Sequence, residues 1–134
     1  MKKIAALITV AALVYSCSSD NLEDLHPIAA TCDTAAVSFA NDILPIMQTQ
    51  CGTNDNSCHQ TDMSSGGYGL ADYQSVFNSI DYTDNDFEPG AFVKCIKHEP
   101  VAGGGTDMPK NAAKLDDCSI NKIVAWINQG RLNN

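Results

Sequence analysis

Hydrophobic residues recur every three or four positions in four separate stretches of this 134-residue chain, which is the spacing of one face of a helix. Three of these stretches cover residues 42–50, 72–80 and 91–96. The fourth follows an N-cap at Asp116 or Asp117 and ends before Gly130, which suits the left-handed position after a helix. The pattern therefore predicts four short helices.

Polar stretches rich in Gly, Ser, Asn and Asp separate these helices, and residues 81–86 belong to one of them. No two runs alternate with period two around a tight turn, so no sheet is expected. Asp42 is expected to cap the first helix, with Pro45 in the first turn, where its missing N–H has no partner to lose. The prediction is an all-α domain of about four short helices with long loops, a loose core that usually needs a filler or covalent staples.

The first residues have the features of an export signal. Two lysines precede a largely apolar run of eleven residues that ends at Val14, too short to span a bilayer as a helix. They lead to Cys17 in a sequence that resembles the lipobox of bacterial lipoproteins, in which that cysteine carries the lipid; an ordinary cleaved signal is the alternative. The expected organisation is a lipoprotein signal peptide (1–16), a polar tether (17–30) and a folded domain (31–134). Export would place the domain in the cell envelope, facing the periplasm or the cell surface, where disulfides persist.

Cys51, Cys58 and His59 form a C-x6-C-H motif directly after the first predicted helix. The related C-x2-C-H motif signals covalent haem, with a thioether from each cysteine and the histidine as an axial ligand. The six residues between the cysteines are small and polar, and such a segment can loop out without pulling the two sulfurs apart. No proline follows closely, so the sequence does not identify an acceptor for the second ring nitrogen of His59.

A candidate for the opposite axial position lies nearer the C-terminus. Met108 follows a run of three glycines and precedes Pro109 and the last predicted helix. A thioether is a soft ligand suited to iron, and a glycine-rich loop can bring it to the open axial face. The residues therefore predict a haem iron between His59 and Met108.

Several stretches resemble small cytochrome c-like lipoproteins of the Bacteroidetes, within the class I c-type cytochromes: VSFANDILPIMQTQC, GGYGLADYQSV, DMPK and KLDDCSINKIVAWINQGRLNN. The resemblance extends over about residues 32–134. It implies a mono-haem electron carrier with haem c attached covalently through Cys51 and Cys58. His59 would be the proximal iron ligand and Met108 the distal one. A lipid anchor in the membrane and a redox partner protein in the envelope are implied with it.

The resemblance also implies a disulfide between Cys32 and Cys118, which would tie the N-terminal segment to the last helix. Cys95 is then the odd cysteine. It would be either buried and free, or paired with Cys51 if Cys58 alone holds the haem.

The composition argues against other classes of function. The chain has 8 Lys and Arg against 16 Asp and Glu, for a formal charge of −8, whereas nucleic-acid binding needs clustered positive charge. No G-x-S-x-G or similar arrangement marks a nucleophile, so an enzyme is not expected. Lys94, Lys97 and Lys110 are the only positive residues near the expected haem edge, so a partner recognised electrostatically would offer basic groups or bind weakly.

Three other interpretations stay open. Cys51 and Cys58 would form a disulfide in a haem-free module that uses the same scaffold for binding or structure. His98 is a rival to Met108 as the distal ligand. A mononuclear copper site built from Cys, His and Met is the third, although such sites prefer a β-sandwich to helices.

Overall fold

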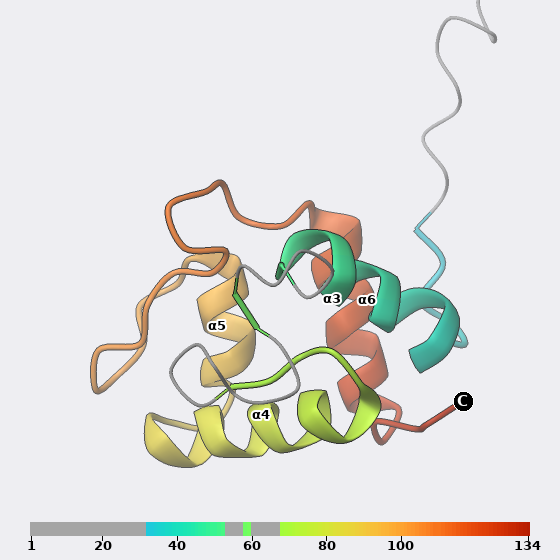
Figure 1. Ribbon diagram of the computed structural model, residues 1–134, viewed down its shortest axis with the longest axis horizontal. Coiled ribbons are helices and arrows are strands. Elements are labelled where there is room, and N and C mark those ends of the chain that lie inside the picture. Colours follow the sequence, from blue (N-terminus) through green and yellow to red (C-terminus); the bar gives the residue numbers. More distant parts are fainter. Residues whose placement is uncertain (1–31, 53–57, 60–67) are drawn as a thin grey trace, which may run out of the picture. The chain divides into compact units, whose positions relative to one another are not determined.

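Four α-helices and one short π-helix, with no strand, make up the part of the chain that the structure describes (Figure 1). They are η1 (Phe39–Ile43), α3 (Leu44–Gln50), α4 (Tyr73–Asp86), α5 (Ala91–Lys97) and α6 (Asp117–Asn128). In this view α4 runs along the lower edge, α5 and α6 stand above it, and α3 lies at the upper edge. The prediction of an all-α domain is confirmed.

This computed structural model describes residues 32–52, 58–59 and 68–134. The expected signal peptide (1–16), the tether (17–30) and the lipidation residue Cys17 lie outside the described residues. Within the described ranges, no helix has the length and apolar content needed to cross a bilayer.

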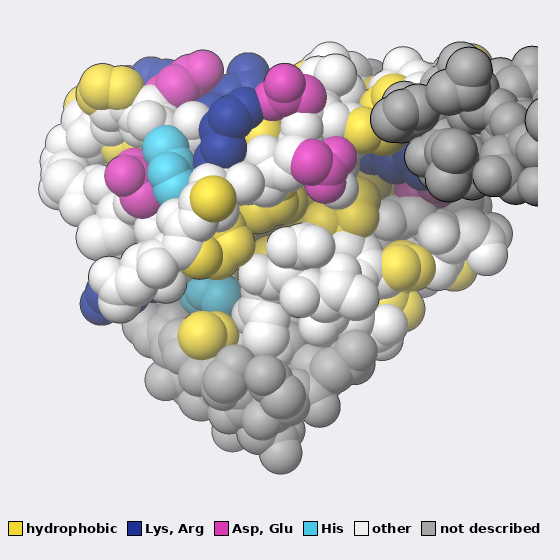
Figure 2. All heavy atoms as spheres, turned by 90° about the horizontal axis from the view of Figure 1, so that it is seen from above, with side chains coloured by type: hydrophobic (Ala, Val, Ile, Leu, Met, Phe, Trp, Pro, Cys, Tyr) yellow, Lys and Arg dark blue, Asp and Glu magenta, His cyan; other side chains and the backbone are white. Residues whose placement is uncertain are grey.

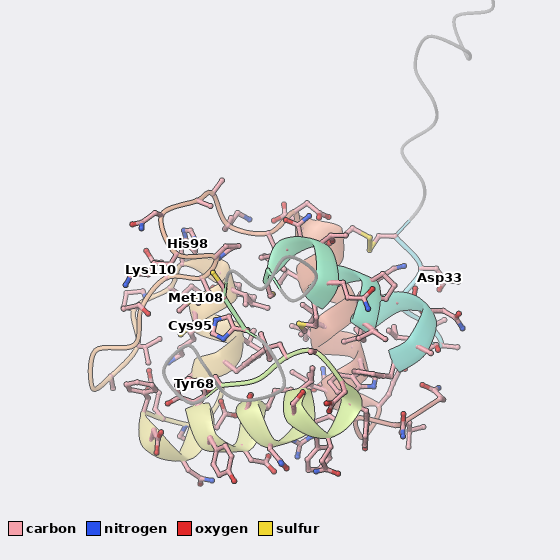
Figure 3. All side chains as sticks on the ribbon, viewed as in Figure 1. Asp33, Tyr68, Cys95, His98, Met108 and Lys110 are labelled. Atoms are coloured by element: carbon pink, nitrogen blue, oxygen red, sulfur yellow. A yellow bond between two sulfur atoms is a disulfide. The ribbon has the colours of Figure 1, made fainter. Side chains whose placement is uncertain are left out.

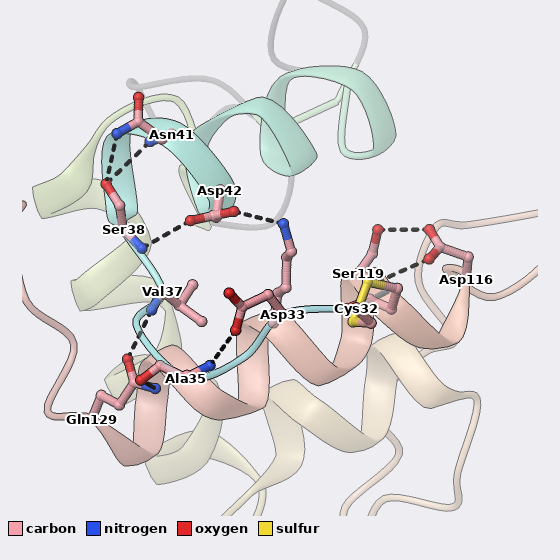
Figure 4. A network of polar contacts seen from close by, with 12 residues as sticks. Cys32, Asp33, Ala35, Val37, Ser38, Asn41, Asp42, Asp116, Ser119 and Gln129 are labelled. Atoms are coloured by element: carbon pink, nitrogen blue, oxygen red, sulfur yellow. Dashed lines mark hydrogen bonds and ion pairs between the residues drawn. A yellow bond between two sulfur atoms is a disulfide. The ribbon is translucent and has the colours of Figure 1, made fainter. Parts of the chain in front are cut away.

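The first helical segment begins earlier than the sequence pattern predicts. Ser38 caps η1 by accepting a hydrogen bond from the backbone N–H of Asn41 (3.3 Å). The prediction that Asp42 caps the helix is wrong, because its carboxylate instead accepts the Ser38 N–H (3.0 Å) and the Lys122 ammonium of α6 (2.6 Å; Figure 4). The Lys122 hydrogen bond, followed by that from Ser38, holds the pKa of Asp42 below its usual value. Pro45 lies in the first turn of α3, as predicted.

Helix α4 is longer than predicted, since it includes residues 81–86, which the sequence pattern assigns to a loop. Thr83 is buried, and its hydroxyl donates to the Ser79 carbonyl one turn back (2.7 Å). Asp81 pairs with Arg131, just beyond the end of α6 (2.6 Å). Thr83 and Asp81 therefore have partners inside the folded domain, and a loop-like composition does not reveal this.

The core gathers around Trp126 in α6, whose side chain is fully buried. Its ring lies against those of Phe39 in η1 and Tyr73 in α4, with centroid distances of 5.5 and 6.4 Å. Its indole N–H donates to the Leu132 carbonyl (2.9 Å), so the polar end of this buried side chain has a partner. The other core residues are Val37, Ile43, Met47, Leu70, Val76, Ile80, Phe92, Ile96, Leu115, Ile120 and Ile123.

Both ends of the described domain are fastened to the α6 and η1 region (Figure 4). Cys32 forms a disulfide with Cys118 in the first turn of α6, which confirms the expected pairing. The backbone N–H of Val37 donates to the side chain of Gln129 (3.1 Å). Asn134 accepts backbone and side-chain hydrogen bonds from η1 and its N-cap. The segments before η1 and after α6 therefore lie against the same pair of helices.

Replacing both Cys32 and Cys118 with Ser should lower the free energy of unfolding by about 4 kcal/mol, because the disulfide closes a long loop in the unfolded chain. Urea unfolding followed by Trp126 fluorescence measures the difference. A reducing agent should lower the stability of the wild type to that of the double variant and leave the double variant unchanged.

The matched control is Cys95→Ser, which changes a buried cysteine that forms no disulfide. Its stability should respond to the reducing agent as that of the wild type does. A double variant as stable as the oxidised wild type would contradict a stabilising role for the disulfide.

Candidate functional site

A cavity of about 720 Å³ opens between the C-terminal end of α3, α5 and the segment that connects α5 to α6. All four residues of the expected haem site line it: Cys51, Cys58, His59 and Met108. Figure 2 shows hydrophobic side chains gathered between histidine side chains on the face that carries the connecting segment. Ligand and cofactor sites enclose about 300–1,000 Å³, so the cavity has the size of such a site.

The cavity walls are predominantly apolar. Six of the lining side chains belong to the core: Met47, Leu70, Phe92, Ile96, Leu115 and Ile123. Cys95 of α5 also lines the cavity, and Figure 3 shows Tyr68 and Met108, two further lining residues, close to this helix. An apolar wall with a few placed polar groups is the usual character of a cofactor site.

The backbone of residues 58–59 lies beside that of residues 51–52. The His59 N–H donates to the Cys51 carbonyl (3.3 Å), and the Cys58 N–H donates to the Gly52 carbonyl (3.5 Å). These bonds hold the Cys-His end of the motif beside Cys51 although six residues separate the cysteines. Residues 53–57 lie outside the described residues. The wide spacing is therefore compatible with both cysteines at one site.

The imidazole of His59 is oriented by a backbone carbonyl. Its Nδ1 lies 2.6 Å from the carbonyl oxygen of Tyr68, so Nδ1 carries the proton and Nε2 is the nitrogen with a lone pair. The backbone of His59 is also held by a hydrogen bond, because its carbonyl accepts the Leu70 N–H (3.4 Å). A hydrogen bond from the second ring nitrogen to a carbonyl is the usual support of a metal-binding histidine, because it fixes the tautomer and raises ligand basicity.

Sequence reasoning missed this acceptor. Tyr68 follows His59 by nine positions and contributes its backbone carbonyl, a group that every residue has. The one sequence feature specific to it is the phenol, which donates to Asp86 at the end of α4 (2.8 Å) and so fixes the residue. That hydrogen bond, with partial burial, raises the pKa of Tyr68 above its ordinary value.

Met108 is held at the C-terminal end of α5. Its N–H donates to the Cys95 carbonyl (3.0 Å), and its carbonyl oxygen lies 3.2 Å from Nε2 of His98. His98 is therefore directed at the backbone of Met108, and its side chain does not line the cavity. The alternative of His98 as the distal ligand has no geometric support, because Met108 lines the cavity and His98 does not.

Burial raises the thiol pKa of two cavity cysteines, Cys51 and Cys95. Burial raises the pKa of the Cys51 thiol to about 12, with a further contribution from Cys58. The Cys51 sulfur lies 3.8 Å from the sulfur of Met47. Cys95 is buried, and burial first, then the nearby Asp107 charge, raises the pKa of its thiol. Neither Cys51 nor Cys95 forms a disulfide, so the alternative pairings of Cys51 are not formed in this structure.

The donor set suits an iron that already has most of its ligands. Among the described residues, no group of three or more His, Cys, Asp or Glu side chains is arranged to hold a metal ion. His59 and Met108 supply one nitrogen and one thioether sulfur to the same cavity. A haem iron needs two axial ligands, because the porphyrin supplies the other four. The residues present therefore fit a haem better than a bare metal ion.

Comparisons of the chain with protein-family models, with curated proteins and with solved structures found no match.

In the folded, haem-free chain, Cys51 should react with iodoacetamide at pH 8 at least about tenfold more slowly than in urea, because its pKa is raised to about 12 and the thiolate is the reacting form. Since the raised pKa favours the protonated thiol, the rate in the folded chain should still be rising above pH 9, where an ordinary thiol has largely ionised. Timed alkylation followed by peptide mass spectrometry measures each cysteine separately. Equal rates for Cys51 in the folded and urea-unfolded chains would contradict its burial.

Proposed function

We propose that this protein is a mono-haem, c-type cytochrome-like electron carrier of the cell envelope, with a cytochrome c-like fold and no enzymatic activity of its own. One observation carries the proposal: two cysteines, an imidazole with its second nitrogen already bonded, and a thioether line a single apolar cavity. The haem would be attached through Cys51 and Cys58. Its iron would be ligated by His59 and Met108.

A haem held in this cavity would supply a one-electron centre that changes between ferric and ferrous iron without gaining or losing a ligand. The chain contributes the conditions for this. The Tyr68 carbonyl fixes the tautomer and direction of the His59 ring. The Met108 thioether is a neutral ligand that favours ferrous iron and raises the potential. The apolar walls limit the access of water, which also raises the potential.

The net charge of the protein, with few lysines near the cavity, indicates the kind of redox partner. Lys110 lines the cavity, and no ion pair involves it within the described part of the chain. Lys94 is paired with Glu88 (2.8 Å), and Lys97 lies 4.0 Å from Glu99, so their charges are largely offset. With a net charge of −8, the protein would attract a redox partner that presents basic groups. Lipidation of Cys17 would hold the domain at a membrane of the envelope.

The full chain, produced together with haem-maturation machinery, should carry haem that survives acid–acetone extraction and should show a sharp α-band when reduced. His59→Ala should abolish the low-spin spectrum, because the proximal ligand is lost. Met108→Ala should leave the haem attached and open the distal position to added ligands. Visible absorption of the purified proteins in both oxidation states measures each outcome.

Met47 offers a matched control, because it is a second methionine on the cavity wall and is fully buried. Met47→Leu removes that thioether at nearly constant volume and should leave the spectrum unchanged. A Met108→Ala spectrum identical to that of the wild type would contradict the distal assignment. Colourless wild-type protein would instead favour a haem-free, disulfide-stapled module with a binding or structural role.

A further inference from the structure

The residue that ends α5 has an unusual backbone for its type. His98 has a φ of 57° and a ψ of 38°, the left-handed conformation in which helices normally end on glycine or asparagine. Its N–H donates to the carbonyls of Lys94 and Cys95, which completes the last turn of the helix. A glycine would complete that turn with less strain, so the backbone conformation does not favour a histidine at this position.

That side chain reaches the loop that carries Met108. Nε2 of His98 lies 3.2 Å from the Met108 carbonyl oxygen, so an N–H on this nitrogen donates to it. Nδ1 lies 4.0 Å from the carboxylate of Asp107, a contact that is an ion pair only when the imidazole is protonated. The imidazole is mostly covered, whereas Asp107 is exposed, so the bond to the carbonyl is the better shielded of the two contacts.

A second hydrogen bond fixes the same residue from the other side. The Met108 N–H donates to the Cys95 carbonyl at 3.0 Å. Both backbone polar groups of Met108 are thus bonded to the last turn of α5. The segment that leads to Met108 is not helical, and Gly103 and Gly104 within it have φ values of 88° and 93°, so no helix of its own holds Met108 in place.

We propose that His98 is the positioning residue for Met108: its imidazole holds the Met108 backbone on the end of α5 and so keeps the thioether at the cavity. This role rests on the proposed function, because it gives the fixed thioether its purpose. His98 itself does not contact the cavity and acts only through Met108. Loss of the imidazole should therefore loosen Met108 without removing any group from the cavity wall.

The test compares His98→Gly with the wild type. Glycine is well suited to the left-handed conformation, so this variant should keep the end of α5 intact while it removes the imidazole. The variant loses the bond from His98 to the Met108 carbonyl, so the bond from the Met108 N–H to Cys95 should open more often. In the haem-free chain, hydrogen exchange at the Met108 amide should therefore become about tenfold faster, as expected when one hydrogen bond no longer holds the residue. Amides within α6 serve as the internal reference and should exchange at unchanged rates.

The haem-loaded protein gives an independent reading. If Met108 dissociates more often in His98→Gly, added imidazole should bind ferric iron about tenfold more tightly than in the wild type, since affinity follows the population of the open state. In His98→Gln the side-chain amide N–H can donate to the same carbonyl. Both the exchange rate at Met108 and the imidazole affinity should therefore return part of the way to their wild-type values. Such a rescue would not follow from a merely structural role.

The two hypotheses fail in different ways. Wild-type protein without haem would overturn the proposed function, yet exchange at the Met108 amide in the haem-free chain would still report on the contact with His98. Unchanged exchange at Met108 in His98→Gly would overturn the positioning role whatever the colour of the protein. Faster exchange together with an unchanged imidazole affinity would overturn the link between that contact and the ligand.

Discussion

The burial of Trp126 between α6 and η1 is the contact on which the rest of the domain depends. Its indole is fully covered, lies against the rings of Phe39 and Tyr73, and donates its N–H to the Leu132 carbonyl. Ile123 lies three positions earlier on the same helix and lines the cavity, so the contact that fixes α6 also fixes one cavity wall. The shape of the site therefore follows from how α6 and η1 meet.

The candidate ligands are positioned by α4 and α5. The Tyr68 carbonyl that orients His59 belongs to a residue anchored by its phenol to Asp86, at the end of α4. The backbone of Met108 is bonded to the end of α5. Helices α4 and α5 are themselves in contact, and α5 also contacts α6. The position of one ligand relative to the other thus depends on helix packing and only indirectly on the segments that carry the ligands.

The helices could be predicted from the sequence because their apolar residues recur at helical spacing and, like Trp126, form the core. Residues 81–86 could not, because Thr83 and Asp81 are satisfied by partners that composition does not show. That Cys51, Cys58, His59 and Met108 share one cavity was foreseeable, because the candidate chemistry of these residues lies in their side chains. The contacts of Tyr68 and His98 were not foreseeable, since one is made by a backbone carbonyl and the other to one.

Both candidate ligands are carried by irregular backbone, yet each is restrained by hydrogen bonds that involve a backbone carbonyl. For His59 the restraint is the bond to Tyr68, and for Met108 it is the pair of bonds to α5. The bonds of residues 58–59 back to residues 51–52 hold the Cys-His end of the motif beside Cys51. A motif with six residues between its cysteines is therefore compatible with a single site. The electron carrier proposed above would require ligands that stay in place, and such anchoring would provide this without a long helix at either candidate ligand.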